Sequence, residues 1–333
     1  MKAHHESVQF TQHGAGLDGA LAFDTSKPGH MLEGLPNTIA GPLGCGRGPD
    51  GARRMKPTFI GIGAQKCASS WLYEILTDHP EAALSEKKEL DFFSYNYEKG
   101  YAWYEQQFPE KPGAKAIGEI SPSYFNDASV PERVRLYSHD LRILLSLRDP
   151  VERALSQHRH LVRIGMVSGP DYRFETALAD NPSYIDQGRY ATHLSSWLAR
   201  FPENQVHVVL MEDIKKDPEE TARKVYEFLG ISPDHRSAAL YEKSNPSYVV
   251  RSKGMENAIR NIRKTTRQLG LERIWQALGD SGLRRLYRGM NRISSEAIVP
   301  PVSTEAIHTL KETFREEIRT LEQLLGRNLE SWH

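Results

Sequence analysis

Short apolar runs alternate with amphipathic segments over most of the chain from Thr58 to Leu229. Apolar and β-branched runs are typical of strands, whereas apolar residues that recur every three or four positions are typical of helices. The pattern predicts strands at 58–62, 82–85, 115–119, 141–147 and 205–210, and helices at 69–78, 131–138, 151–163, 190–200 and 218–229. Strands separated by helices predict an α/β fold with helices flanking a central, mainly parallel sheet. In such sheets, ligands bind beyond the carboxyl ends of the strands.

The C-terminal part of the chain has a different pattern. Residues 251–333 are predicted to be mostly helical and to pack on the α/β domain. The last helix is predicted at about 303–325, and it ends near Gly326 because glycine is common just beyond a helix C-terminus. Leu329 and Trp332 are expected to fold back onto the core.

Composition narrows the classes of partner and compartment. Residues 1–54 hold ten of the 25 glycines and show no sustained periodicity, which predicts a flexible, Gly-rich N-terminal arm ahead of a domain over 55–333. The 43 basic and 43 acidic residues balance, which argues against nucleic acid as a partner. No apolar run is long enough to predict a membrane span, and Cys45 and Cys67 are too few for a disulfide framework. We therefore expect a reducing, cytoplasmic setting.

The segment TFIGIGAQKCASSWL, residues 58–72, carries the candidate chemistry. Its apolar run breaks at Gly63, and Lys66, Ser69 and Ser70 follow at the start of an amphipathic helix. A helix N-terminus attracts anions through its unpaired N–H groups and the positive end of its dipole. The loop is therefore predicted to hold a phosphate or sulfate group.

Other anion-binding motifs fit this loop less well. A P-loop triphosphatase needs GxxxxGK followed directly by Ser or Thr, but here Cys67 and Ala68 separate Lys66 from the serines. A dinucleotide site would need a third glycine, after Gly61 and Gly63, where the lysine stands. An ordinary turn with a solvated lysine remains an alternative.

A second motif, RDPVERALSQHRH, follows the strand at 141–147. Arg148 lies at the strand end and Ser156 lies on the following helix, so both can surround one anionic group. The alternative is a structural network between Arg148 and the carboxylates of Asp149 and Glu152.

A third motif, SEKKELDFF, places Glu89 beside Lys87 and Lys88 near the same edge of the sheet. A carboxylate tuned by a neighbouring lysine can act as a general base, although a solvated charge cluster is the simpler reading. The aromatic residues of 92–104 either line an acceptor cleft or pack a helical subdomain, and the sequence leaves both open.

Six motifs in register resemble those of the sulfotransferases, in particular the branch with the heparan-sulfate enzymes. They are GAQKCASSWL, KKELDFF, GEISPSYF, RDPVERALSQHRH, RYATHLSSWL and KDPEETARKVYEFLGI, and the resemblance covers about residues 57–250. It implies a P-loop-like fold that binds 3′-phosphoadenosine 5′-phosphosulfate (PAPS) as sulfuryl donor, without a metal. The implied acceptor is a small molecule, a lipid or a saccharide with a hydroxyl or amine group.

The resemblance also implies roles for individual residues. Glu89 corresponds to the catalytic base, and Lys66 to a cation that stabilises the leaving phosphate. Arg148 and Ser156 correspond to ligands of the 3′-phosphate, and Tyr190 to a segment that lines the cleft. The remaining implied donor contacts are Cys67, Ala68, Ser69, Ser70 and Trp71 in the loop and Ser252, Lys253 and Gly254 in a late clamping loop.

The chain departs from the family pattern at positions that bear on donor and acceptor binding. Cys67 and Ala68 stand where glycines are frequent, which narrows the approach of the backbone to the phosphosulfate. Ile120 stands where some carbohydrate sulfotransferases carry a lysine, which removes a charge that could contact an anionic glycan. A P-loop kinase or triphosphatase, and a non-catalytic nucleotide-binding member, remain the rival functions.

Overall fold

A five-stranded parallel sheet forms the centre of the fold in the computed structural model, which describes residues 55–167, 172–241, 248–250, 292–294 and 299–333. The strands are β1 Phe59–Gly63, β2 Ala82–Leu84, β3 Ala116–Ile120, β4 Arg142–Leu147 and β5 Val206–Leu210. Their spatial order is β2-β3-β1-β4-β5, and each adjacent pair is parallel. The chain therefore changes direction across the sheet at β1, between β3 and β4, which is where such sheets bind ligands.

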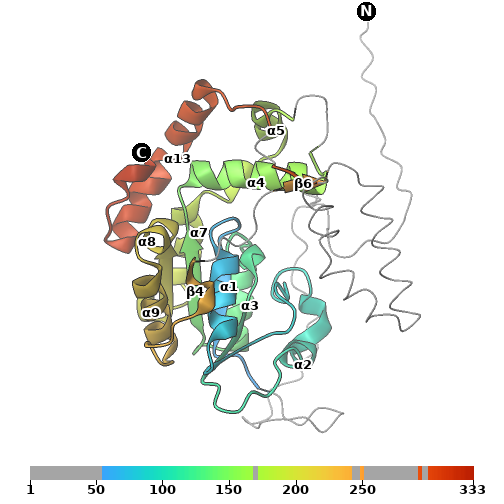
Figure 1. Ribbon diagram of the computed structural model, residues 1–333, viewed down its shortest axis with the longest axis vertical. Coiled ribbons are helices and arrows are strands. Elements are labelled where there is room, and N and C mark those ends of the chain that lie inside the picture. Colours follow the sequence, from blue (N-terminus) through green and yellow to red (C-terminus); the bar gives the residue numbers. More distant parts are fainter. Residues whose placement is uncertain (1–54, 168–171, 242–247, 251–291, 295–298) are drawn as a thin grey trace, which may run out of the picture. The chain divides into compact units, whose positions relative to one another are not determined.

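Helices cover both faces of the sheet (Figure 1). The longer ones are α1 Ser69–Asp78, α3 Val130–Tyr137, α4 Pro150–Ile164, α7 Tyr190–Leu198, α9 Pro218–Leu229 and α13 Thr304–Leu325. The shorter ones are α2 Gly100–Glu105, α5 Phe174–Asp180, α6 Ser183–Asp186 and α8 Met211–Lys216. A separate antiparallel pair joins β6 Tyr248–Val250 to β7 Arg292–Ser294.

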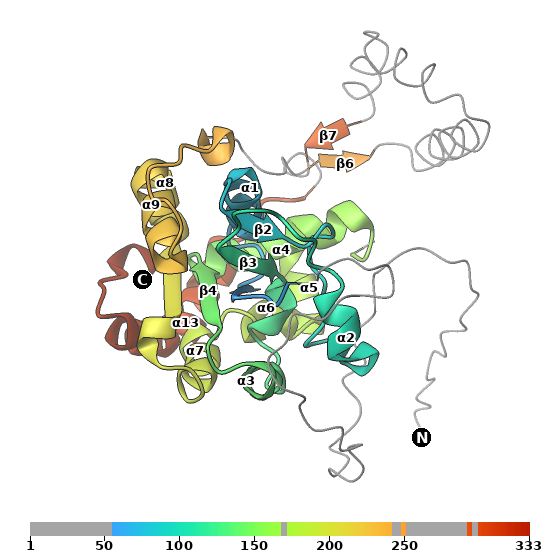
Figure 2. The same ribbon diagram turned by 90° about the horizontal axis from the view of Figure 1, so that it is seen from below.

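Side chains on the two faces of the sheet form two separate hydrophobic cores. Phe59 of β1 and Leu144 of β4 face the layer formed by α1 and α9. Ile60 and Ile62 of β1 face the opposite layer, to which α3, α4, α7 and α13 contribute (Figure 2). Successive side chains of a strand point to opposite faces, so a strand buried on both sides is apolar throughout.

Local sequence signals define the helix ends. Asp149 accepts hydrogen bonds from the N–H groups of Val151 and Glu152 at the start of α4, and Pro150 occupies its first turn. Gly326 ends α13 in the left-handed conformation with φ 59°. Beyond it, Leu329 and Trp332 are 3% and 1% exposed, which confirms that the C-terminal segment folds back onto the core.

The predicted sheet and its flanking helices are confirmed, with boundaries that differ by only a few residues. The strand β7 is a difference, because Arg292–Ser294 lies in the part predicted to be helical. The predicted N-terminal arm, residues 1–54, and about half of the predicted helical segment, residues 251–291, lie outside the described residues.

Candidate active site

The loop between β1 and α1 is anchored to the neighbouring strand β4. The N–H of Ala64 donates to the carbonyl of Ser146 at 2.7 Å, and the Ser146 hydroxyl donates to the carbonyl of Gly63 at 3.0 Å. Gly63 has φ 143°, and a Cβ added there would lie 2.8 Å from Cβ of Phe125. Only glycine fits this close approach, so the loop position is fixed against the next layer of the fold.

No side chain caps the N-terminus of α1, a feature that it shares with α3 and α7. Side chains cap α4, α9 and α13, whereas the N-cap of α1 is Ala68, whose side chain cannot cap. Lys66 and Ala68 both have φ 67°, so the loop alternates through left-handed backbone just before the helix. Alternating left- and right-handed residues turn N–H groups to one side, and the helix dipole adds positive potential there. This end of α1 is suited to an anion.

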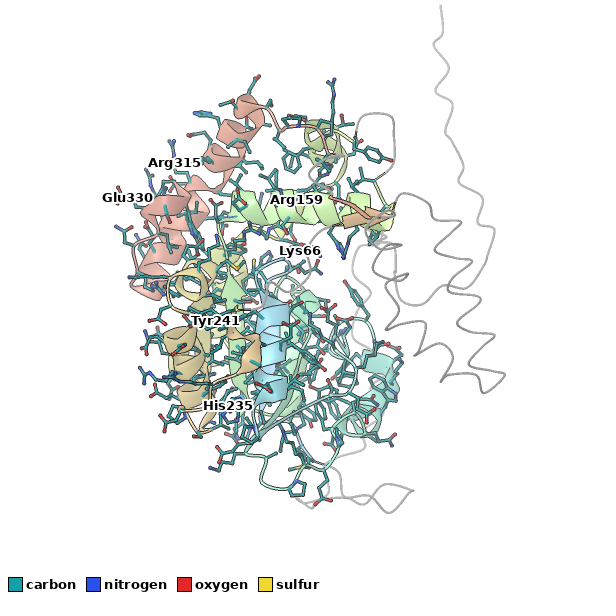
Figure 3. All side chains as sticks on the ribbon, viewed as in Figure 1. Lys66, Arg159, His235, Tyr241, Arg315 and Glu330 are labelled. Carbon is teal, nitrogen blue, oxygen red and sulfur yellow. The ribbon has the colours of Figure 1, made fainter. Side chains whose placement is uncertain are left out.

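Lys66 lies in a half-buried position among other charges. The pKa of its ammonium group is lowered to about 8, chiefly by burial and also by Arg163 and Lys88, while the carboxylate of Glu89 opposes the shift. Figure 3 shows Lys66 between the N-terminal end of α1 and the helix α4, on which Arg159 is labelled. The loop, α4 and the segment around Glu89 therefore share one electrostatic environment.

The segment with Lys88 and Glu89 reaches the start of α1. The Lys88 ammonium donates to the Ser70 hydroxyl at 2.9 Å and lies 3.0 Å from a carboxylate oxygen of Glu89. The Glu89 side chain is 47% exposed. A solvent-accessible carboxylate thus stands beside two lysines at the predicted anion site, a combination that suits proton transfer next to a bound anion.

Arg148 lies at the end of β4, on the same edge of the sheet. One terminal nitrogen donates to Glu152 at 2.7 Å, so part of the predicted structural network is present. The Nε atom of Arg148 is buried and meets no hydrogen-bond partner among the residues that the structure describes. Asp149 caps α4, and Ser156 is half-buried further along that helix. An orphaned buried donor on an arginine is suited to an anionic ligand.

Three of the predicted donor residues point into the protein interior. The Cys67 thiol is buried and lies 3.5 Å from the Tyr190 hydroxyl, and burial raises its pKa to about 11. Tyr190 is itself 1% exposed. The Trp71 indole donates to the carbonyl of Leu240 at 3.1 Å within the core on the other side of the sheet. The side chains of these residues support the loop from inside, and Ser252, Lys253 and Gly254 lie outside the described residues.

The family model of the sulfotransferase domain matches residues 56–267, which is more than half of the chain. The chain belongs to the sulfotransferase family. Enzymes of this family use PAPS as the sulfuryl donor, so the class, the fold and the donor predicted from the sequence are confirmed at the level of the family.

Individual sulfotransferases are similar to this chain over part of their length. Heparan sulfate glucosamine 3-O-sulfotransferase 3A1 of Mus musculus is 33% identical over 207 residues, which are 60% of this chain and 51% of that protein. The Homo sapiens protein of the same name is 32% identical over 232 residues, which are 68% of this chain and 55% of that protein. The chain therefore spans about half the length of the curated relatives it matches.

A solved structure shows the same fold. The sulfotransferase of Alicyclobacillus acidocaldarius superposes with a TM-score of 0.59 at 24% identity, covering 84% of this chain and 99% of that one.

The aromatic segment after Glu89 forms part of the sulfotransferase core. Phe92 and Tyr104 are buried and stacked, with ring centroids 4.4 Å apart, and Phe93 packs edge-on against Tyr104 at 5.1 Å. These residues pack the helical subdomain instead of lining a cleft. Tyr95 and Tyr101 are 42% and 38% exposed, and Tyr97 and Trp103 are half-buried, so these residues offer the aromatic surface that an acceptor could contact.

Sequence reasoning did not identify the buried carboxyl group of Glu119. It is fully buried at the end of β3 and accepts hydrogen bonds from the hydroxyls of Ser121 and Tyr124. The signal was a charged residue in an otherwise apolar strand, followed by hydroxyl residues in the motif GEISPSYF. Arg153 was also missed: it is buried and donates to Gln157 at 2.7 Å.

The described part of the chain holds no cluster of three or more His, Cys, Asp or Glu residues that could bind a metal ion. Within the same residues, no helix has the length and apolar character needed to cross a bilayer.

Proposed function

We propose that this protein transfers the sulfuryl group of PAPS to a hydroxyl group of a saccharide, with Glu89 as the general base. The observation that carries the proposal is the meeting of three features at the switch point of the sheet. The uncapped N-terminus of α1, the ammonium group of Lys66 and the carboxylate of Glu89 converge there, and Lys88 bridges Glu89 to Ser70.

The loop and Lys66 are assigned to the 5′-phosphosulfate of the donor. When the sulfur–oxygen bond breaks, negative charge develops on the leaving 5′-phosphate, and a cation and aligned N–H groups stabilise it. Lys66 is protonated at neutral pH because its pKa is about 8. Arg148, with its orphaned Nε, and Ser156 are assigned to the 3′-phosphate.

Glu89 is assigned to the acceptor side of the reaction. The acceptor oxygen forms a bond to sulfur as the bond from sulfur to the 5′-phosphate breaks, and Glu89 takes the proton that the acceptor loses. Its exposure leaves room for an acceptor hydroxyl, and the nearby cations of Lys66 and Lys88 keep it close to the reacting groups.

The saccharide class is supported by the relatives, whose names describe heparan sulfate glucosamine 3-O-sulfotransferases. Ile120 departs from the pattern of carbohydrate sulfotransferases. Its side chain is 1% exposed and would meet a Cβ placed on Gly61 at 2.7 Å, so it belongs to the core and offers an acceptor no charge. We therefore expect a saccharide acceptor to make fewer ionic contacts here than in a lysine-containing relative.

Labelled-sulfate transfer from PAPS tests the proposal directly. The acceptors are a glucosamine-containing polysaccharide and p-nitrophenol, and transfer to the first but not to the second is expected. Lys66→Ala and Glu89→Gln should each lower kcat by about 100-fold or more, because each removes a group that acts in the transition state. The matched controls are the exposed residues Lys215→Ala and Glu86→Gln, which should retain parental activity.

Calorimetry separates the rival functions. Binding of 3′-phosphoadenosine 5′-phosphate (PAP) without binding of ATP and magnesium is expected for a sulfotransferase, and the reverse would favour a triphosphatase. A Glu89→Gln variant that binds PAP and retains parental turnover would remove Glu89 as the base. A parent protein that binds PAP but transfers to no hydroxyl acceptor would support the non-catalytic alternative.

A further inference from the structure

A strap of main chain, residues 89–93, carries the proposed base and is held by a polar network on the end of β3. The N–H of Leu90 donates to one carboxylate oxygen of Glu119 at 3.2 Å. The N–H of Asp91 donates to the Ser121 hydroxyl at 2.9 Å. The next two N–H groups both reach the Tyr124 hydroxyl, from Phe92 at 2.8 Å and from Phe93 at 3.3 Å.

The two hydroxyls in turn donate to the same carboxylate. Ser121 Oγ lies 2.5 Å from one oxygen of Glu119, and Tyr124 Oη lies 2.6 Å from the other. These lengths are typical of hydroxyl donors to an ionised carboxylate. Each hydroxyl donates its proton to Glu119, so its oxygen lone pairs face the strap. There they accept hydrogen bonds from the N–H groups of the main chain. The carboxylate therefore sets the direction of every hydrogen bond in the network.

The conformation of the strap needs this support. Glu89 and Asp91 have φ 64° and 51°, in the left-handed region that residues other than glycine rarely adopt. No regular secondary structure over 89–93 supplies the missing hydrogen bonds. The four consecutive N–H groups of 90–93 all depend on the end of β3, so the placement of Glu89 against Lys66 depends on it as well.

We propose that Glu119 is a positioning residue for sulfuryl transfer: through Ser121 and Tyr124 it holds the strap that presents Glu89 to the acceptor. The inference rests on the proposed function, in which Glu89 is the base. Glu119 itself is fully buried and does not reach the surface where donor and acceptor meet.

The test compares Glu119→Gln and Tyr124→Phe with the parent. Glutamine offers one acceptor oxygen and an amide donor, so one hydroxyl loses its acceptor; phenylalanine removes a hydroxyl without changing the shape of the ring. The matched control is Tyr226→Phe, which removes a buried hydroxyl bonded to the carbonyl of Ile75 in the core on the other face of the sheet.

The first measurement is hydrogen exchange of the peptide that covers the strap. Both variants should exchange the amides of 90–93 at least about tenfold faster than the parent, with β4 unchanged, because the loss is local. The control should leave the strap at the parental rate. Unchanged protection of the strap in Glu119→Gln and Tyr124→Phe would overturn the proposal.

The second measurement is turnover with the glucosamine-containing polysaccharide, together with calorimetry of PAP. We expect kcat to fall about 10- to 100-fold in each variant, since small misplacements of a catalytic group have effects of this size. The Kd of PAP should stay within about threefold, because the strap serves the acceptor side. A parallel loss of PAP affinity would show a collapse of the donor site and would contradict a positioning role.

The double variant Glu119→Gln/Tyr124→Phe distinguishes one network from two independent effects. If the residues act together, the double variant is no slower than the slower single variant, whereas independent effects multiply. Multiplied losses would overturn the proposal. If the parent protein transfers no sulfate at all, the proposed function fails, while the exchange experiment still decides whether Glu119 holds the strap.

Discussion

Lys66 combines two effects that oppose each other in the absence of a ligand. Burial and the neighbouring cations Arg163 and Lys88 disfavour its charge, and Glu89 restores part of the loss. A bound anion would favour the charged form further, because an opposite charge at short range raises the pKa of a lysine. The residue is therefore tuned so that its protonation and the binding of a phosphate support each other.

Binding of PAP should consequently depend on pH near 8. The pKa of Lys66 is about 8 without ligand and rises in the complex, so binding takes up protons between about pH 8 and 9 and weakens as the pH rises further. Calorimetry in two buffers with different ionisation enthalpies measures this uptake. In Lys66→Arg the uptake should disappear, because arginine stays protonated throughout this range. Equal proton uptake by parent and variant would assign it to another group.

At the scale of the elements, the sheet and helices follow from the sequence because their signals are local. The apolar run of β4, the proline and aspartate at the start of α4 and the glycine after α13 each lie within or next to the element that they define. The supporting contacts of the site are not local. Cys67 contacts Tyr190, which lies 123 positions away in the sequence, and Glu119 accepts a hydrogen bond from Leu90 of the strap, 29 positions away. No periodicity encodes such pairs, so the sequence suggests Lys66 and Glu89 as candidates but does not predict the contacts that hold the segments carrying them.

The loop before α1 offers a prediction about strain. Ala68 has φ 67°, a conformation that costs an alanine about 1 kcal/mol relative to glycine. Ala68→Gly relieves this cost but adds freedom to the unfolded chain, so we expect a net gain in the free energy of unfolding of at most about 1 kcal/mol. Ala68→Val, which is β-branched, should destabilise instead. Urea denaturation of both variants measures the change in the free energy of unfolding. A large decrease for Ala68→Gly would show that the backbone at Ala68 is not strained.

At the scale of the whole molecule, contacts run from the C-terminal segment to the loop. Trp332 packs edge-on against Tyr190 with ring centroids 6.1 Å apart, and the Tyr190 hydroxyl contacts the Cys67 thiol. Tyr190 thus links Trp332, which follows the last helix, to Cys67 in the loop before α1. Packing of the C-terminal segment and the geometry of the site are parts of one core.

Trp332→Ala should therefore be costly. Removing a buried tryptophan typically costs about 3–5 kcal/mol, and Trp332 is 1% exposed. We expect a loss of this order in the free energy of unfolding, measured with urea. Leu136→Ala is the control: Leu136 is 68% exposed, and its removal should change stability by no more than about 0.5 kcal/mol. A loss for Trp332→Ala as small as that of the control would show that the C-terminal segment is not part of the core.

The buried carboxyl group of Glu119 links the stability of the whole molecule to pH. Burial raises its pKa from the ordinary value of 4.5 to about 7, although hydrogen bonds from Ser121 and Tyr124 oppose the shift. Between these two pH values the folded state holds a proton that the unfolded state has released. Stability contributed by the protonated group is therefore complete below about pH 4.5 and is lost as the pH rises to about 7, by at most about 1.4 kcal/mol per pH unit.

Glu119→Gln cannot titrate and should remove this slope. Urea denaturation of parent and variant from pH 5 to 7.5 measures it, and the histidines shared by both proteins cancel in the difference. We expect the parent to lose stability relative to the variant as the pH rises toward 7, and parallel curves would contradict the raised pKa. The direction matters for the mechanism: at neutral pH and above, the fold carries the cost of an ionised Glu119, and that same ionised carboxylate is the acceptor on which the strap of Glu89 depends.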